Sequence, residues 1–292
     1  MLVVSEIAEN LEKFAKSMLK RNIDVSPKLK KILKLDEKRR ASQAKLDNIL
    51  AESNQVAREI GELFKKGESE KAITLKEKAA SLKEDSKKLA TNLNELVSQL
   101  KITLLDVPNV PHYLVPSGNS EKDNLKILQE GKIPELHKNA LPHWELASKY
   151  NIIDFELGTK ITGAGFPVYK DKGAKLQRAL INLFLDLNIN AGYKEIQVPI
   201  LINQDSGTAT GQLPDKEGQM YIVNEDNLYL APTAEVPLTN IYRNSILNSN
   251  ELPICLTSYT PCFRREAGSY GSHVRGLNRL HQFDKVELVR IE

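Results

Sequence analysis

The stretch that decides the fold is Thr260–Glu287, which reads TPCFRREAGSYGSHVRGLNRLHQFDKVE. It predicts two β-strands, Thr260–Glu266 and Arg279–Arg290, because glycines and turn-forming residues fill the loop between them. Side chains alternate between the faces of a strand, so Arg264 and Glu266 share one face. Arginine suits phosphate, aromatic rings stack on nucleobases, and carboxylates hold amines. All three types line one face of the second strand, which carries Arg279, His281, Phe283, Lys285 and Glu287.

The same residues form a long sequence pattern. FRREAGSYG followed by VRGLNRLHQFDKVE resembles motif 2 of the class II aminoacyl-tRNA synthetases, in the form used by seryl-tRNA synthetases. The resemblance implies that the hairpin binds ATP, with Arg264 in the catalytic role of holding the α-phosphate. It also implies that Glu266 contacts the adenine, that Phe283 stacks on it and that Arg279 pairs with the γ-phosphate. Glu287 would bind serine.

Two other parts of this motif are Arg265 and the loop between the strands. Arg265 belongs to the ATP-binding stretch, but neighbouring strand residues face opposite sides, so we expect its role to involve the backbone or the surface. The loop Gly271–Arg275 differs from the Lys-Asp sequence of many relatives. In the family this loop approaches the acceptor end of tRNA.

A second motif lies in Leu228–Leu238, LYLAPTAEVPL. A strand leads into the tripeptide Thr233, Ala234 and Glu235, and taken alone this tripeptide could be a helix start capped by the threonine hydroxyl. In seryl-tRNA synthetases T-A-E is the serine-binding loop. The resemblance therefore implies that these three residues and Glu287 hold L-serine.

A third motif predicts self-association. Gly173–Leu187 has the apolar spacing of a helix. Gly192–Ile202 reads as a strand interrupted by Pro199, which favours an edge strand or a bend. Together they resemble motif 1 of the class II enzymes, which implies a homodimer formed around Pro199.

The first hundred residues predict a separate helical arm. From Ser26-Pro27 to Leu100 there is no proline, and apolar residues recur every seven positions on both sides of Gly67. This pattern is typical of two antiparallel coiled-coil helices over about 27–100, and alone it fits a solvated or dimerising coiled coil. In the family such an arm embraces the long variable arm of tRNA(Ser), mainly through phosphate and sugar. Candidate contacts are Arg39, Arg40, Lys45, Arg58 and Lys65.

The composition adds few constraints. The net charge of +3 gives no global field for nucleic acid, and two cysteines form neither a disulfide framework nor a metal pattern. The chain begins without a signal peptide and has no apolar run of membrane length, so we expect a cytoplasmic protein with no membrane partner. We expect an α+β fold with the arm in 1–107 and, after a proline-rich hinge, an antiparallel-sheet class II catalytic domain in 108–292.

The resemblance implies a reaction. ATP, with Mg²⁺ bridging its phosphates, would activate L-serine to seryl-adenylate, and the seryl group would pass to tRNA(Ser) and also to tRNA(Sec). The family has a third motif, with another arginine for ATP, and no residue after Glu287 matches it. We therefore expect a truncated catalytic domain, inactive by itself. Two alternatives remain, namely a non-catalytic coiled-coil RNA-binding fragment and another class II synthetase.

Overall fold

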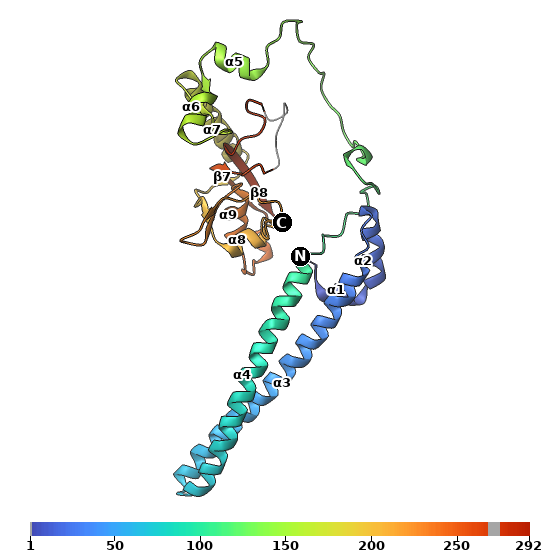
Figure 1. Cartoon of the computed structure of the whole chain (residues 1–292), viewed down its shortest axis with the longest axis vertical. Coiled ribbons are helices and arrows are strands. Elements are labelled where there is room, and N and C mark those ends of the chain that lie inside the picture. Colours follow the sequence, from blue (N-terminus) through green and yellow to red (C-terminus); the bar gives the residue numbers. More distant parts are fainter. Residues whose placement is uncertain (1, 268–274) are drawn as a thin grey trace. The chain divides into compact units, whose positions relative to one another are not determined.

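The computed structural model describes residues 2–267 and 275–292, and it divides the chain into two compact units, Met1–Ile133 and Pro134–Glu292. Within the described residues no helix is both long enough and apolar enough to cross a membrane. The predicted α+β class is confirmed, since a helical arm precedes a unit built from small sheets and helices (Figure 1). The predicted boundary between residues 107 and 108 falls inside the first unit and stays a prediction.

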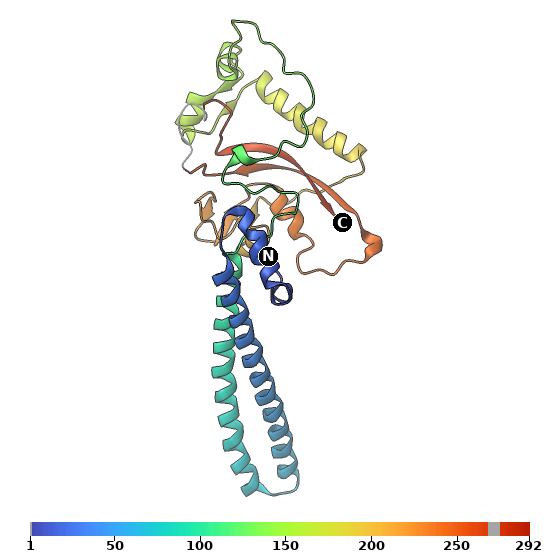
Figure 2. The ribbon, with the colours of Figure 1, turned by 90° about the vertical axis from the view of Figure 1, so that its right-hand side faces the viewer.

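The first unit is dominated by two long helices, α3 (Ser26–Lys65) and α4 (Ser69–Leu105), which run antiparallel and side by side (Figures 1 and 2). Proline in the first turn favours the start of α3, because its missing N–H has no partner to lose there. The turn between the helices contains Gly67, whose φ of 77° is accessible to glycine without strain. The predicted two-helix arm is thus confirmed.

The heptad positions form the seam of this arm. Residues on the repeat are buried or half-buried along both helices, and the buried ones are Leu35, Leu46, Val56, Ala72, Leu93 and Leu100. At the base, the short helices α1 (Val4–Glu9), α2 (Leu11–Met18) and η1 (Leu19–Arg21) close a larger core. Ile7, Met18 and Leu29 are completely buried there. The arm therefore has its own core at the base and only a narrow seam toward its tip.

The segment that follows the arm is tied to that base. Lys20 Nζ donates to the carbonyl oxygens of Tyr113 and Val115, at 2.6 and 3.0 Å. Asn22 donates to the carbonyl oxygen of Gly118 at 3.1 Å. The single turn η2 (Glu121–Asp123) comes next.

The second unit contains three small sheets and five α-helices among its described residues. The helices are α5 (His143–Lys149), α6 (Phe155–Ile161), α7 (Lys172–Asn190), α8 (Gln204–Ala209) and α9 (Glu235–Asn240), and a single turn, η3 (Ser249–Glu251), precedes the longest strands. β1 (Ile153–Asp154) pairs with β2 (Val168–Tyr169). A second sheet has the order β4-β6-β5, formed by Leu201–Ile202, Leu228–Leu230 and Ile222–Val223.

The third sheet is built on a long antiparallel hairpin of β7 (Ile254–Phe263) and β8 (Gln282–Ile291). A short strand, β3 (Lys194–Glu195), joins β7 in parallel. One face of the hairpin packs against α9, where Leu256 and Val289 meet Leu238. The opposite face lies along α7 (Figure 2), and Asn188 donates to the Thr257 hydroxyl at 2.9 Å. Helices thus cover both faces.

The hairpin strands differ from the predicted ones at their loop ends. The first strand was predicted to reach Glu266, but it ends at Phe263, and the second begins at Gln282 rather than Arg279. Beyond the last pair, the Arg265 amide turns away to the carbonyl oxygen of Gln219 at 2.9 Å. Glu266 then adopts a left-handed φ of 47°, which ends an extended strand. The predicted alternation of Arg264 and Glu266 on one strand is therefore wrong.

Candidate functional site

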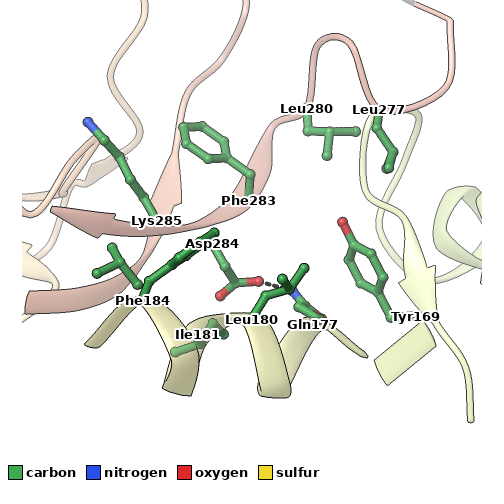
Figure 3. Close-up of a pocket in the computed structure, with 11 residues that line it drawn as sticks. Tyr169, Gln177, Leu180, Ile181, Phe184, Leu277, Leu280, Phe283, Asp284 and Lys285 are labelled. Atoms are coloured by element: carbon green, nitrogen blue, oxygen red, sulfur yellow. Dashed lines mark hydrogen bonds between the residues drawn. The ribbon is translucent and has the colours of Figure 1, made fainter. Parts of the chain in front are cut away.

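Side chains of β8 form the floor of the candidate site. Phe283 and Lys285 project from one face of the strand, whereas Asp284 points the other way toward α7 (Figure 3). This period-two alternation is the predicted one. Because β7 and β8 pair in register over ten residues each, these side chains are held on a continuous hydrogen-bonded ladder.

The loop after β6 brings Thr233 onto this face. The Ala231 amide donates to Ile200 O at 2.8 Å, and its carbonyl accepts from the Phe263 amide at 3.1 Å, so the loop is fixed to the end of β7. The Thr233 hydroxyl donates to Glu287 Oε2 at 2.5 Å and accepts from Lys285 Nζ at 3.1 Å. Lys285 Nζ also lies 2.5 Å from Glu287 Oε2. One hydroxyl, one ammonium and one carboxylate thus form a closed triangle, which is called the Thr233 triangle below.

The residues that follow Thr233 begin a helix. Ala234 is buried and is the N-cap residue of α9, without a side-chain cap. The Glu235 amide donates to the Thr233 hydroxyl at 3.2 Å, while the Glu235 side chain is exposed. The Thr233 hydroxyl therefore accepts a hydrogen bond from the first turn of α9, although Thr233 lies one position before the N-cap. The same hydroxyl donates its own hydrogen bond to Glu287.

Arg264 lies directly beyond β7 and is held over the face. Its guanidinium carbon lies 5.1 Å from the centre of the Phe283 ring, within the range of a cation–π contact. Its Nε donates to the Pro232 carbonyl at 3.4 Å, and its backbone amide donates to His281 O at 2.9 Å. A cation is thus pre-positioned beside an aromatic ring.

Three other predicted residues lie at the edge of this arrangement. The Arg279 guanidinium lies 3.7 Å from the carboxylate of Glu266, whose side chain is mostly buried. Arg279 itself is exposed and stands in a bend before β8. Arg265 is exposed too, and its backbone amide donates to the carbonyl oxygen of Gln219. The predicted loop Gly271–Arg275 lies outside the described residues except for Arg275.

Lys285 is the site residue to which the sequence prediction gave no role. It was placed on the same strand face as Phe283 and Glu287, so the period-two pattern already indicated it. The pattern could not indicate Thr233, which is distant in sequence. Its hydroxyl lies 3.1 Å from Lys285 Nζ because the tertiary fold brings the two residues together.

A buried thiol lies under the face. Cys262 is fully buried at the end of β7, opposite Phe283 in the strand register. Burial raises the pKa of the Cys262 thiol, which keeps it protonated. A protonated, inaccessible thiol is a packing residue rather than a nucleophile.

The opposite face of the hairpin is fixed to α7 by one carboxylate. Asp284 accepts from the Tyr259 hydroxyl at 2.6 Å and from the Gln177 amide (Figure 3). Asp284 and Gln177 border a cavity of about 300 Å³ that Tyr169, Phe184 and Leu280 also line. Burial first, and then the bond to Asp284, raises the pKa of Tyr259 to about 12.

Replacing Tyr259 with phenylalanine is expected to lower the free energy of unfolding by about 1.5–3 kcal/mol, the scale of a hydrogen bond to a charged group. Urea denaturation measures the free energy of unfolding. Tyr150→Phe, at an exposed tyrosine, is the control. The folded pKa of Tyr259 lies above the unfolded value of about 10, so this contribution is complete below pH ~10 and is lost as the pH rises through ~12. An unchanged alkaline decline in the variant would contradict the assignment.

The residues of the arm that were predicted to contact tRNA have different surroundings. Arg39 and Arg40 both pair with Asp36, at 2.7 and 2.9 Å. Lys45, Arg58 and Lys65 are exposed along α3.

Comparisons with known proteins concern both units of the chain. Residues 1–111 match the seryl-tRNA synthetase N-terminal domain, and residues 219–292 match the tRNA synthetase class II core domain (G, H, P, S and T). The chain is 45% identical over 260 residues to a serine–tRNA ligase of Salinibacter ruber, covering 89% of this chain and 61% of that protein. It is 40% identical over 291 residues to the serine–tRNA ligase of Mesoplasma florum. This alignment covers 100% of this chain and 68% of that protein.

A solved structure is similar as well. The seryl-tRNA synthetase of Pyrococcus horikoshii, crystallised with ATP, aligns with a TM-score of 0.80 at 30% identity. The alignment covers 99% of this chain and 69% of that one. The chain thus spans between three fifths and seven tenths of the length of these relatives.

Proposed function

This chain belongs to the serine–tRNA ligase family, and we propose from that membership and from the β8 face that it takes part in the ATP-dependent charging of tRNA(Ser) with L-serine. In the first step the serine carboxylate attacks the α-phosphorus of ATP, which gives seryl-adenylate and releases pyrophosphate. In the second step a hydroxyl of the terminal ribose of tRNA takes the seryl group and AMP leaves. The observation that carries the proposal is the Thr233 triangle beside Arg264 and Phe283.

The nucleotide is assigned to the Arg264 side of the face. The adenine would stack on Phe283, and the guanidinium beside that ring would stabilise the negative charge that grows on the α-phosphate during attack. Glu266, with a mostly buried carboxylate, would accept from the adenine amino group, and the exposed Arg279 would meet the γ-phosphate. Arg265 would contribute to the nucleotide site through its backbone. These roles need positioned charge more than acid–base chemistry.

Serine is assigned to the triangle and the start of α9. Glu287 would receive the serine ammonium, and Thr233, Ala234 and Glu235 would form the wall around it. Lys285 would keep Glu287 and Thr233 in place through its two contacts. A site that hydrogen-bonds a small hydroxyl rejects alanine, because its polar groups would then be left unpaired.

A magnesium ion is implied by the family resemblance, but the residues on this face do not fit a protein-held ion. Within 2–267 and 275–292 there is no group of three or more His, Cys, Asp or Glu that could hold a metal. The carboxylates of Glu266 and Glu287 already pair with Arg279 and Lys285. Magnesium often binds through few carboxylates and mainly through substrate phosphates, so ATP would have to supply most of its ligands.

The arm is assigned to tRNA, with tRNA(Sec) as a second substrate if it shares the same long variable arm. Exposed Lys45, Arg58 and Lys65 suit phosphate contacts along α3. Arg39 and Arg40 would have to leave Asp36 or share it with the RNA.

Shortening the arm is expected to weaken tRNA binding without affecting the β8 face. Removing residues 43–91 and joining the helices by a glycine–serine turn keeps Leu35 and Leu100 in the base. Filter binding of tRNA(Ser) across salt concentrations should show a weaker affinity and a salt slope that falls by roughly one for each lost phosphate contact. Binding of a seryl-adenylate analogue is the control. Equal loss of both activities would exclude a dedicated tRNA arm.

A homodimer through α7 and the Pro199 region is the last part of the proposal. α7 carries a row of exposed apolar side chains at helical spacing, namely Leu176, Leu180, Leu183, Phe184 and Leu187. Pro199 interrupts the predicted strand, so only β3 and β4 form on its two sides. An exposed apolar row of this kind is typical of an interaction surface.

A further inference from the structure

A turn between α8 and β5, residues 215–221, has no role in the reaction above. It is closed by the carboxylate of Asp215, whose two oxygens each accept from one backbone amide. The Gln219 amide donates to Oδ1 and the Met220 amide donates to Oδ2, both at 2.8 Å. Met220 is buried in the core of this unit. The turn is therefore fixed from inside by one side chain, and Gln219 with it.

Asp215 keeps its charge in this half-buried position. Desolvation raises the pKa of the Asp215 carboxyl, but hydrogen bonds from the backbone amides of Met220, Gln219 and the two residues before them outweigh it, so the pKa lies below its ordinary value. At neutral pH the carboxylate is thus ionised and accepts with both oxygens.

Gln219 holds the chain on both sides of Glu266. Its carbonyl oxygen accepts from the Arg265 amide at 2.9 Å, and its side-chain amide donates to the Ala267 carbonyl at 3.4 Å. Between these contacts Glu266 adopts its left-handed φ of 47°. A residue other than glycine keeps such a conformation only where its surroundings impose it. The two contacts from Gln219 are on the page as the groups that impose it here.

The other end of the turn is fixed beside β8. The Tyr221 hydroxyl lies 2.6 Å from His281 Nδ1, and the Tyr221 carbonyl accepts from the Leu230 amide at 3.0 Å. The His281 carbonyl in turn accepts from the Arg264 amide. The turn thus contacts both the segment that follows β7 and the segment that precedes β8.

We infer that Asp215 is a positioning residue for recognition of the adenine amino group: by fixing Gln219, it keeps the Glu266 carboxylate in the orientation that accepts from this group. The inference rests on the proposed role of Glu266 in the nucleotide site. A carboxylate in that place disfavours a purine with a carbonyl oxygen instead of the amino group, because two acceptors would face each other. Asp215 therefore contributes to the choice of ATP over inosine triphosphate.

Calorimetric titration of the chain with ATP and with inosine triphosphate measures this choice. The unmodified chain should prefer ATP at least about fivefold, the lower end for discrimination by a good contact to a base edge. In Asp215→Ala the preference should fall to about twofold or less, through a loss of affinity for ATP, because the carboxylate of Glu266 is then no longer held in place. Asp226→Ala, at an exposed aspartate in the turn between β5 and β6, removes the same charge and should keep the preference.

A second variant keeps the test decisive if Asp215→Ala does not fold. Gln219→Ala removes the contact to Ala267 and leaves the Asp215 carboxylate in its turn, and it should lower the preference for ATP at least about twofold, the scale of one weak hydrogen bond. Equal weakening of both nucleotides, or an unchanged preference, would make Asp215 a purely structural residue and overturn the inference alone. An unmodified chain that binds both nucleotides equally would instead contradict the role proposed for Glu266, and the inference would fall with it.

Discussion

Replacing Arg264 with alanine is expected to weaken binding of ATP and of a non-hydrolysable seryl-adenylate analogue by roughly 30-fold or more, the scale for removing one partner of a desolvated charge pair. The guanidinium carbon lies 5.1 Å from the centre of the Phe283 ring, and Nε donates to the Pro232 carbonyl, so the charge is already positioned before ATP binds. In forms of the protein that catalyse adenylate formation, the loss in rate should be on the order of 10²–10³, as for a preorganised charge-stabilising donor.

Isothermal titration measures this loss, and Arg290→Ala is the matched control. Arg290 lies on the same strand, but it is exposed and pairs with Glu292. An Arg264→Ala protein that binds ATP as tightly as the Arg290→Ala protein would show that the hairpin is not the nucleotide site.

Glu287→Gln is expected to have the second large effect, and to act on serine rather than on ATP. The substitution keeps the shape of the side chain but leaves Lys285 without its counter-charge, and it removes the acceptor proposed for the serine ammonium. Affinity for the seryl-adenylate analogue should fall by roughly 30-fold to several thousand-fold, the range for breaking a desolvated ion pair. Affinity for ATP alone should change little.

The comparison of the two ligands makes this second result specific. Glu195→Gln, an exposed carboxylate on β3, controls for the loss of one negative charge. If Glu287→Gln weakened ATP and the seryl analogue equally, Glu287 would be a structural residue of the face and not the serine contact.

The sequence predicted the arm well because helical periodicity is a local property. A repeat of seven continues through α3 and α4, so the seam could be assigned without knowing which residues meet. The glycine turn at Gly67 divided the repeat, and its left-handed φ agrees with that prediction.

The ends of the hairpin could not be predicted in the same way. Arg264–Glu266 continue the alternation of a strand, yet the Arg265 amide bonds to Gln219, which is distant in sequence and decides where pairing stops. The Thr233 triangle likewise joins a loop to β8 across more than fifty residues. Periodicity placed Lys285 and Glu287 on the right face, but the partner that organises them follows from tertiary structure alone.

Selection of serine as an adenylate by the β8 face can be measured on the chain itself. The unmodified chain is titrated calorimetrically with non-hydrolysable seryl- and alanyl-adenylate analogues that differ by one hydroxyl. We expect the seryl analogue to bind and the alanyl analogue to bind at least about tenfold more weakly, because the wall of the site at Thr233 would lose its polar partner in a desolvated site. Equal affinities for the two analogues would contradict it.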